Sequence, residues 1–476
     1  MKKHLILTAL ASVSMLLTGC ATIGNNGSNT ESLSSSEETP VEGSWTILIY
    51  MCGSDLESGA EYDDYGNYLG SNTSEAGFAS KDISEILKVS DQPKDVNIVI
   101  ETGGARAWAN KKISASKLGR WHVENKDIVK DEEITYKSMG DSKTLSDFLT
   151  WGLQKYPADK TGVILWNHGG AMQGVCQDET PTGGFDMLTN SEVKTALQTT
   201  FTASGLSSDD RLEFIGYDAC LMQVQDVAEF NSHYFNYMVG SEESEAGDGW
   251  EYNTWVSDLY AKKSTEQILG KIADRFVKAY DSLYPGYAND QTQSVLDLRK
   301  MASYKEAWED LAKSIGSSIS SYGKSNFHTF LKTKVKYFSA ATYTYAELQE
   351  LAQEYSDYYG ETITVNYLIK YFEMEKIDGV YWDFSTANRF AVFDVKDFLN
   401  KIIANDSFSA VKSKAQTALA ALNELVIKNV AGNEAGESYG LSFFFPVSSS
   451  VGKSTYYKTS ETNFTSWRSV VNSYGA

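Results

Sequence analysis

Five short segments that are apolar throughout constrain the fold of this chain most strongly. Stretches with helical periodicity separate them, so strand and helix signals alternate along the sequence. Strands that are apolar on both faces are typical of a parallel sheet covered by helices on both sides. The sequence therefore predicts an α/β fold with a mostly parallel sheet flanked by helices. The expected strands lie at 46–51, 96–101, 162–167, 212–217 and 237–242, and the expected helices at 79–89, 145–155, 191–200 and 224–231.

Two of the expected strands end on reactive side chains. The third strand runs into His168 and Gly169, and the fourth runs into Asp218 and Cys220. In open α/β sheets, ligands bind beyond the carboxyl ends of the strands. A cysteine after a buried strand often only fills the core. A histidine at a second strand end favours a catalytic thiol here, because an imidazole and a thiol together can form a thiolate nucleophile.

The residues around these strand ends resemble the clostripain family of cysteine peptidases, which share a caspase- and gingipain-like fold. The resemblance rests on Asn167-His168-Gly169-Gly170 after one strand and on Asp218-Ala219-Cys220-Leu221-Met222 after the next. The spacing of 52 residues between His168 and Cys220 is close to the corresponding distance in caspases. Flanking segments that fit the same family lie at 46–51 with 53–57, at 240–244 with 247–250, and at 439–446.

The resemblance implies a role for each site residue. Cys220 attacks the scissile carbonyl and forms a thioester, and His168 protonates the leaving amine and later activates water. The backbone N–H groups of Gly169 and Cys220 form an oxyanion hole. Asp218 lies in the first substrate pocket and pairs with Arg or Lys, and Asp248 lines the same pocket. From the residues alone, Asp218 could equally be a structural carboxylate, and Asp248 could belong to an ordinary Asp-Gly turn.

The sequence predicts no metal site and no required cofactor. It contains no His-Glu-x-x-His motif and no Cys/His cluster with zinc spacing, and we expect His122 and His233 to be structural. Some relatives depend on Ca²⁺, but the acidic residues near the first strand lack the spacing of an EF-hand loop, and a solvated charged loop is the favoured interpretation. These acidic residues are Asp55, Glu57, Glu61, Asp63 and Asp64.

The first twenty residues predict export and a lipid anchor. Lys2 and Lys3 precede an apolar run that ends at Leu17-Thr18-Gly19-Cys20, which resembles the signal of a bacterial lipoprotein. Cleavage before Cys20 and acylation of its thiol would tether the protein to the bacterial cell surface or to a periplasm-facing membrane. An ordinary secretory signal is the alternative. Residues 1–19 are thus the expected signal peptide, and the Ser-, Asn- and Glu-rich residues 20–43 a flexible stalk.

The remaining chain divides into two regions. Residues 44–290 are the expected caspase-like peptidase domain, with an additional hairpin at 119–123 and 134–137. Residues 291–476 are more helical and either form a separate domain or complete the first one. A strand-like segment at 440–445 could return to the main sheet.

The net charge limits the binding partners of the protein, and the cysteine content limits its disulfides. The formal net charge of −21 repels nucleic acid and would concentrate cationic peptides near the surface. After Cys20 the chain retains Cys52, Cys176 and Cys220, so at least one thiol is free even if the first two form a disulfide.

Together these observations predict a cysteine endopeptidase that acts on proteins or peptides after Arg or Lys. The alternative is a lipid-anchored surface protein that binds peptide or glycan on a peptidase-like scaffold without cutting it, because fold does not determine function. The presence of both His168 and Cys220 favours the enzyme.

The distribution of basic residues predicts that the active protein stays a single, tethered chain. Residues 169–193 contain no Lys or Arg, and neither do residues 20–80. Between His168 and Cys220 the basic residues are Lys194, within an expected helix, and Arg211, directly before the nucleophile strand, and such backbone is poorly placed to enter an active site. An enzyme restricted to basic residues is therefore not expected to cut its own His–Cys loop or its stalk. Gel and mass analysis of the active protein and of a Cys220→Ala variant should show a single uncut chain in both. Fragments broken within 169–193 in the active form alone would contradict both the processing prediction and the basic specificity.

Overall fold

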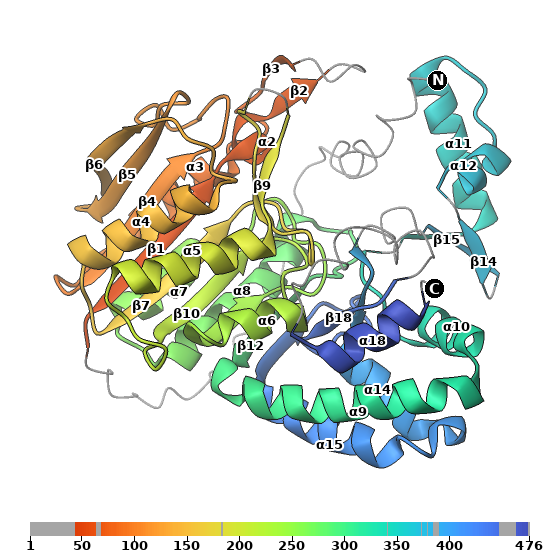
Figure 1. Ribbon diagram of the computed structural model, residues 1–476. Coiled ribbons are helices and arrows are strands. Elements are labelled where there is room, and N and C mark those ends of the chain that lie inside the picture. Colours follow the sequence, from red (N-terminus) through yellow and green to blue (C-terminus); the bar gives the residue numbers. More distant parts are fainter. Residues whose placement is uncertain are drawn as a thin grey trace, which may run out of the picture.

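The computed structural model describes residues 43–62, 68–181, 184–339, 341–372, 374–377, 379–383, 390–446 and 463–474 (Figure 1). The predicted signal peptide, Cys20 and all but the last residue of the predicted stalk lie outside the described residues, as do Asp63 and Asp64. Within the described part of the chain, no helix is both long and apolar enough to cross a membrane.

A sheet of nine strands forms the centre of the molecule, in the order β17-β12-β11-β10-β7-β1-β4-β5-β6. The five predicted strands are all present and are mutually parallel, which confirms the fold class. Antiparallel strands extend both sides, and β5 and β6 form the additional hairpin, whose second strand lies at 127–135 rather than at the predicted 134–137. The strand bounds are β1 (Trp45–Cys52), β4 (Val96–Gly103), β5 (Lys117–Glu124), β6 (Asp127–Thr135), β7 (Lys160–Trp166), β10 (Leu212–Asp218), β11 (Phe235–Gly240), β12 (Thr292–Asp297) and β17 (Val426–Ala431).

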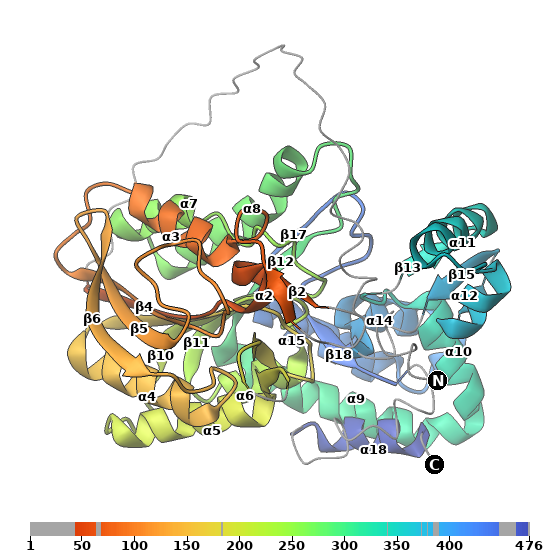
Figure 2. The same cartoon turned by 90° about the horizontal axis from the view of Figure 1, so that it is seen from above.

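Helices cover both faces of this sheet, because successive side chains of each strand point to opposite sides. In β1, Leu48 and Tyr50 belong to the hydrophobic core on one face, and Ile47 and Ile49 belong to the core on the other. Figure 2 shows α3, α7 and α8 on one side of the strands and α4, α5 and α6 on the other. Their bounds are α3 (Phe78–Lys88), α4 (Ser142–Lys155), α5 (Asn190–Ala203), α6 (Gln225–Asn231), α7 (Tyr252–Tyr260) and α8 (Thr265–Leu283).

The region after residue 290 contributes to this same body. Strands β12 and β17 extend the main sheet, and several of its helices pack on the core that also contains Leu165 and Tyr217 of β7 and β10. The segment 440–445, for which a return to the main sheet was left open, instead contains β18, which pairs with β16, and the unpredicted β17 occupies the sheet edge. The bounds are α9 (Met301–Tyr322), α10 (Lys324–Lys334), β16 (Val392–Asp394), α14 (Val395–Ala404), α15 (Lys412–Leu425), β18 (Ser442–Phe444) and α18 (Thr465–Tyr474).

A smaller unit projects from this body, at the right of Figures 1 and 2. It has a three-stranded sheet and its own hydrophobic cluster around Leu348, Leu368 and Phe372. The unit contains β13 (Ala341–Tyr343), α11 (Tyr345–Tyr359), α12 (Val365–Tyr371), β14 (Glu375–Ile377) and β15 (Val380–Asp383). The remaining short elements are α2 (Ser54–Ser58), β2 (Ala60–Tyr62), β3 (Tyr68–Ser71), β8 (Val175–Asp178), β9 (Asp186–Leu188) and the 3₁₀ turns η2 (Leu298–Lys300) and η3 (Asp406–Phe408).

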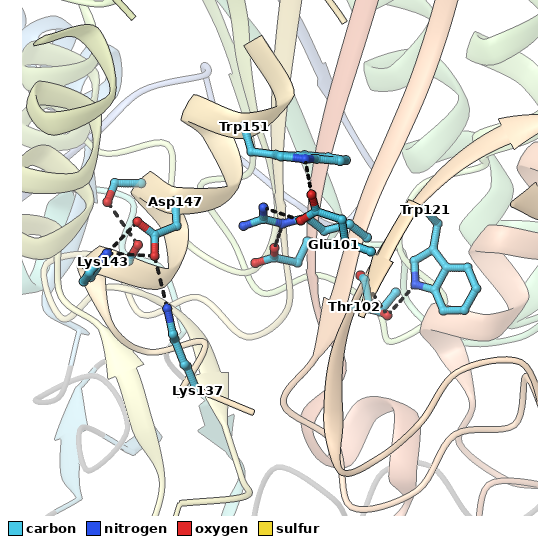
Figure 3. Close-up of polar contacts among 11 residues, drawn as sticks. Glu101, Thr102, Trp121, Lys137, Lys143, Asp147 and Trp151 are labelled. Carbon is cyan, nitrogen blue, oxygen red and sulfur yellow. Dashed lines mark hydrogen bonds and ion pairs between the residues drawn. The ribbon is translucent and has the colours of Figure 1, made fainter. Parts of the chain in front are cut away.

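A buried ion pair joins β4 to β5 at directly opposed positions. Arg120 donates from Nε to Glu101 at 2.7 Å, and its guanidinium lies over the ring of Trp151, whose position beside Glu101 is visible in Figure 3. Burial raises the pKa of Glu101 to about 7, although Arg120 lowers it. Because this pKa lies above the ordinary value of 4.5, ionisation of Glu101 costs stability as the pH rises from about 4.5 to 7.

Replacing the cation of this pair should destabilise the protein in a pH-dependent way. Arg120→Met leaves Glu101 without its counter-charge and should cost about 3–5 kcal/mol of unfolding free energy near pH 8. The loss should be smaller near pH 5, where the carboxyl is protonated. The matched control is Lys143→Met, whose exposed pair with Asp147 (Figure 3) should be worth about 0–1 kcal/mol. Denaturant unfolding at both pH values measures this, and equal losses for Arg120→Met would contradict it.

Candidate active site

The pairing of β7 with β10 places His168 and Cys220 at the same edge of the sheet. The two strands are parallel neighbours, and Trp166 lies opposite Asp218 in their register. His168 and Cys220 each follow two residues beyond this pair. The backbone N–H of Asn167 also donates to the carbonyl of Asp218 at 3.2 Å, which ties the two strand ends together.

Gly169 lies in direct backbone contact with Cys220. A Cβ atom at position 169 would lie 2.2 Å from the carbonyl oxygen of Cys220 and 3.1 Å from the Cβ of Ala219. Contacts below 3.0 Å with a backbone atom cannot be relieved by a side-chain rotation. The approach of the two strand ends therefore requires a glycine, and it brings together the two residues predicted to form the oxyanion hole.

The end of β7 is held by neighbouring strands. Asn167, which is 3% exposed, donates from Nδ2 to the carbonyl of Cys52 at 2.7 Å and accepts from the N–H of Gln177 at 2.7 Å. The carbonyl of His168 accepts from the N–H of Cys176 at 3.0 Å. The backbone that carries His168 is thus fixed on both sides.

The imidazole of His168 contacts Asp55, with Nε2 2.9 Å from Oδ1. Partial burial raises the pKa of Asp55, but the charge of His168 and the hydrogen bonds from His168 and Ser54 outweigh it and hold that pKa well below its usual range. We placed Asp55 in the acidic cluster and missed this contact. Asp55 follows β1, which neighbours β7, so its position after a third parallel strand end was the signal that could have found it.

The thiol of Cys220 is covered by the segment that follows β11. The N–H of Glu245 donates to Sγ at 3.2 Å, and Sγ lies 3.8 Å from the carbonyl of Glu245. Burial raises the pKa of Cys220 to about 12, and the charges of Glu245 and Glu243 add to this effect. In this conformation the thiol is therefore protonated at neutral pH. Leu221, the next residue, has a left-handed φ of 65°, a strained geometry that is frequent at functional sites.

The other two cysteines are buried free thiols. Cys52 and Cys176 are both 0% exposed and form no disulfide with each other, so the disulfide that the sequence left open is not present. Burial raises the pKa of each thiol. Neither cysteine offers an accessible thiolate, whereas Cys220 is only half-buried.

Asp218 is buried close to Cys220 and is 5% exposed. Tyr252 donates to its Oδ2 at 2.9 Å, and a Cβ atom at Gly249 would lie 2.9 Å from its Oδ1. Burial raises the pKa of Asp218 to about 7, although the hydrogen bonds from Tyr252 and from the backbone of Trp250 lower it. Asp248 lies on the same segment as Gly249, and its Oδ2 accepts a 2.5 Å hydrogen bond from Tyr284.

No group of three or more His, Cys, Asp or Glu side chains is arranged to hold a metal ion within the described ranges. Of the residues considered for calcium, Glu57 is buried and accepts hydrogen bonds from Ser80 and the N–H of Ala109, so it braces the backbone. His122 pairs with Asp131, and His233 lies 3.5 Å from Glu229.

The comparisons with known proteins agree with this architecture. A model of the clostripain family, Peptidase C11, matches residues 67–475, so the chain belongs to the clostripain family. Clostripain from Hathewaya histolytica is 24% identical, in a match that covers 74% of this chain and 65% of clostripain. The chain thus spans somewhat less than two thirds of that relative's length.

Two solved structures are similar to this chain in fold. A secreted C11 cysteine protease from Bacteroides thetaiotaomicron, bound to an irreversible peptide inhibitor, has a TM-score of 0.55 and 16% identity, covering 90% of this chain and 98% of that one. An inactive zymogen C11 protease from Parabacteroides distasonis has a TM-score of 0.54 and 17% identity, covering 88% and 99%. At these identities the likeness concerns the fold alone.

The contact at Gly169 predicts that alanine substitutions at two adjacent glycines have very different effects on stability. Gly169→Ala should force β7 and β10 apart at their ends and cost about 1–3 kcal/mol of stability. Gly170→Ala is the matched control, because its Cβ would meet only side chains, at 3.3 Å or more. Thermal unfolding of both variants measures the difference, and equal midpoints would show that the strand ends are not in this contact.

Proposed function

We propose that this protein is a cysteine endopeptidase that hydrolyses peptide bonds after Arg or Lys. The observation that carries the proposal is the meeting of the two strand ends, where the backbone of Gly169 contacts that of Cys220. His168 follows one strand and the nucleophile follows the other, with Asp55 orienting the imidazole. Membership of the clostripain family supports the same chemistry.

In the proposed mechanism, Cys220 transfers its proton to His168 and its sulfur attacks the scissile carbonyl carbon. The N–H groups of Gly169 and Cys220 stabilise the oxyanion that forms. His168 then donates a proton to the leaving amine, and a thioester remains on Cys220. Water, activated by His168, attacks the thioester and releases the acid. These reaction steps use only protein groups and water, and we assign no cofactor to them.

The proposed specificity comes from Asp218, with Asp248 as a second contributor on the loop before α7. A buried carboxylate gains charge-assisted hydrogen bonds from a guanidinium or ammonium group. The backbone N–H of Glu245 covers the thiol of Cys220, and burial raises the pKa of that thiol. A substrate that reaches the thiol therefore has to displace the backbone of Glu245.

We also propose that the protein is exported and lipid-anchored through Cys20. The support is the sequence of residues 1–20, with Lys2 and Lys3 before an apolar run that ends at the cysteine. One relative of similar fold is described as secreted. The substrates are then extracellular or surface proteins and peptides, and nucleic acid is not a partner.

Covalent labelling tests the nucleophile and separates the enzyme from a non-catalytic binding protein. A peptide ketone electrophile that ends in Arg should add one label to the protein by intact mass, and Cys220→Ala should lose both labelling and hydrolysis. Cys52→Ala and Cys176→Ala should retain both, because their thiols are fully buried. Labelling of Cys220→Ala would refute the assignment, and equal rates for an electrophile ending in norleucine would refute the basic specificity.

A further inference from the structure

Three carboxyl groups from different parts of the fold interact electrostatically near the end of β10. Asp82 comes from α3, Asp218 from the end of β10, and Glu245 from the segment after β11. Asp82 is 2% exposed and Asp218 is 5% exposed, and both oxygens of Glu245 are shielded from solvent. Burial raises the pKa of Asp82 and that of Glu245, and the charge of Asp218 adds to the effect in both cases.

This carboxyl cluster (Asp82, Asp218 and Glu245) has no basic partner. Among the described residues, no Lys or Arg forms an ion pair with any of the three, although surface acids of this protein are frequently paired. The other titratable groups that act on the cluster are also acidic or phenolic. They are Glu85 on α3, Asp248 on the loop before α7, and Tyr252 on α7, and the thiol of Cys220 lies next to Glu245.

Buried polar atoms around Glu245 are also left without hydrogen bonds. Neither oxygen of Glu245 has a partner of normal geometry, and neither the oxygen nor the nitrogen of the Gln293 amide has one. Gln293 is 0% exposed, and it interacts electrostatically with Glu245, as does the indole of Trp250. Orphaned buried polar atoms are costly and rare in native structures. The unpartnered atoms are three acceptors, on Glu245 and Gln293, and two donors, Nε2 of Gln293 and Nε1 of Trp250. The acceptors outnumber the donors, and a cationic donor is the kind of group that would satisfy them.

The same segment connects this cluster to the nucleophile. The N–H of Glu245 donates to Sγ of Cys220, and four residues later Gly249 packs against the carboxylate of Asp218. A ligand that enters beside Asp218 therefore has to act on the segment that covers the thiol.

We propose that Glu245 is a further specificity-determining carboxyl of the pocket, and that a basic side chain entering beside Asp218 displaces a proton that the buried carboxyl groups of Asp218 and Glu245 hold in the closed state. The inference rests on the proposed function. In the empty pocket, one carboxylate and one carboxylic acid carry a single negative charge. On binding, the acid O–H gives its proton to the buffer, and two carboxylates face one guanidinium or ammonium group. No covalent bond to the ligand forms in this step.

The proton exchange predicts a pH dependence with a defined sign. Burial raises the pKa of Asp218 to about 7 and raises that of Glu245 well above its ordinary value, so at low pH a cation has to expel a proton to bind. The affinity for a basic side chain should therefore rise as the pH rises through about 7. A neutral side chain of the same length should show no such change.

Calorimetry in the Cys220→Ala background tests this directly, because it measures binding without cleavage. Two peptide amides that end in Arg or in norleucine are titrated near pH 7 in two buffers with different ionisation enthalpies. The Arg peptide should release roughly one proton, and the norleucine peptide none. Adding Glu245→Gln should lower the affinity for the Arg peptide by about tenfold or more and should remove the proton release, because one of two charged partners is lost.

Glu243→Gln is the matched control on the same segment. The carboxylate of Glu243 accepts from the N–H groups of Ser244 and Ser339 rather than facing Asp218, so its neutralisation should leave the proton release and the discrimination between peptides unchanged. Unchanged Arg binding in Glu245→Gln would overturn the inference while leaving the labelling of Cys220 intact. If Glu245→Gln does not fold, the Cys220→Ala protein still tests the inference, because binding of the Arg peptide without proton release would also overturn the inference. If the electrophile fails to label Cys220 but the Arg peptide still releases a proton on binding, the proposed catalysis is refuted and the proposed pocket is retained.

Discussion

The close approach of the ends of β7 and β10 is the constraint on which the site depends. Parallel pairing in one register puts Trp166 opposite Asp218, and the chain then continues on both strands to the residues of the proposed dyad. A shift of one residue would exchange the two faces of the strand and separate these side chains. Gly169 permits the final contact because it has no Cβ to meet the carbonyl of Cys220. The proposed oxyanion hole is thus a consequence of strand pairing and of one missing side chain.

Electrostatics around the nucleophile favour a closed, neutral state. The thiol of Cys220 lies against the backbone of Glu245, where burial makes a thiolate unfavourable and the charges of Glu245 and Glu243 add to that effect. The same carboxyl groups are buried without a cation among the described residues. A basic side chain would place a positive charge beside these carboxyl groups and would offset their contribution to the raised pKa of the thiol. Substrate recognition and activation of the nucleophile are therefore linked through one short segment in the proposed function.

Much of the fold could be predicted from local patterns. The five parallel strands, the first strand of the hairpin and the helices between them follow from apolar runs and helical periodicity, and they are present close to the expected bounds. The second strand of the hairpin, β6, was placed too late in the chain. The region after residue 290 was harder, because short strands such as β17 and β18 have no distinctive pattern. Whether such a segment joins the main sheet or pairs elsewhere depends on which edge is open, and that is a property of the assembled sheet.

The sequence by itself determined the fold class, the family resemblance and the candidates His168, Gly169, Asp218 and Cys220, because each of these depends on residues that are adjacent in the chain. Only the tertiary structure decided which side chains from distant segments act on them. Asp55 reaches His168 from the end of β1, and Glu245 reaches Cys220 from beyond β11. Burial in three dimensions then set the pKa of the thiol and of the carboxyl groups, since desolvation depends on everything packed around a group and not on its neighbours in sequence.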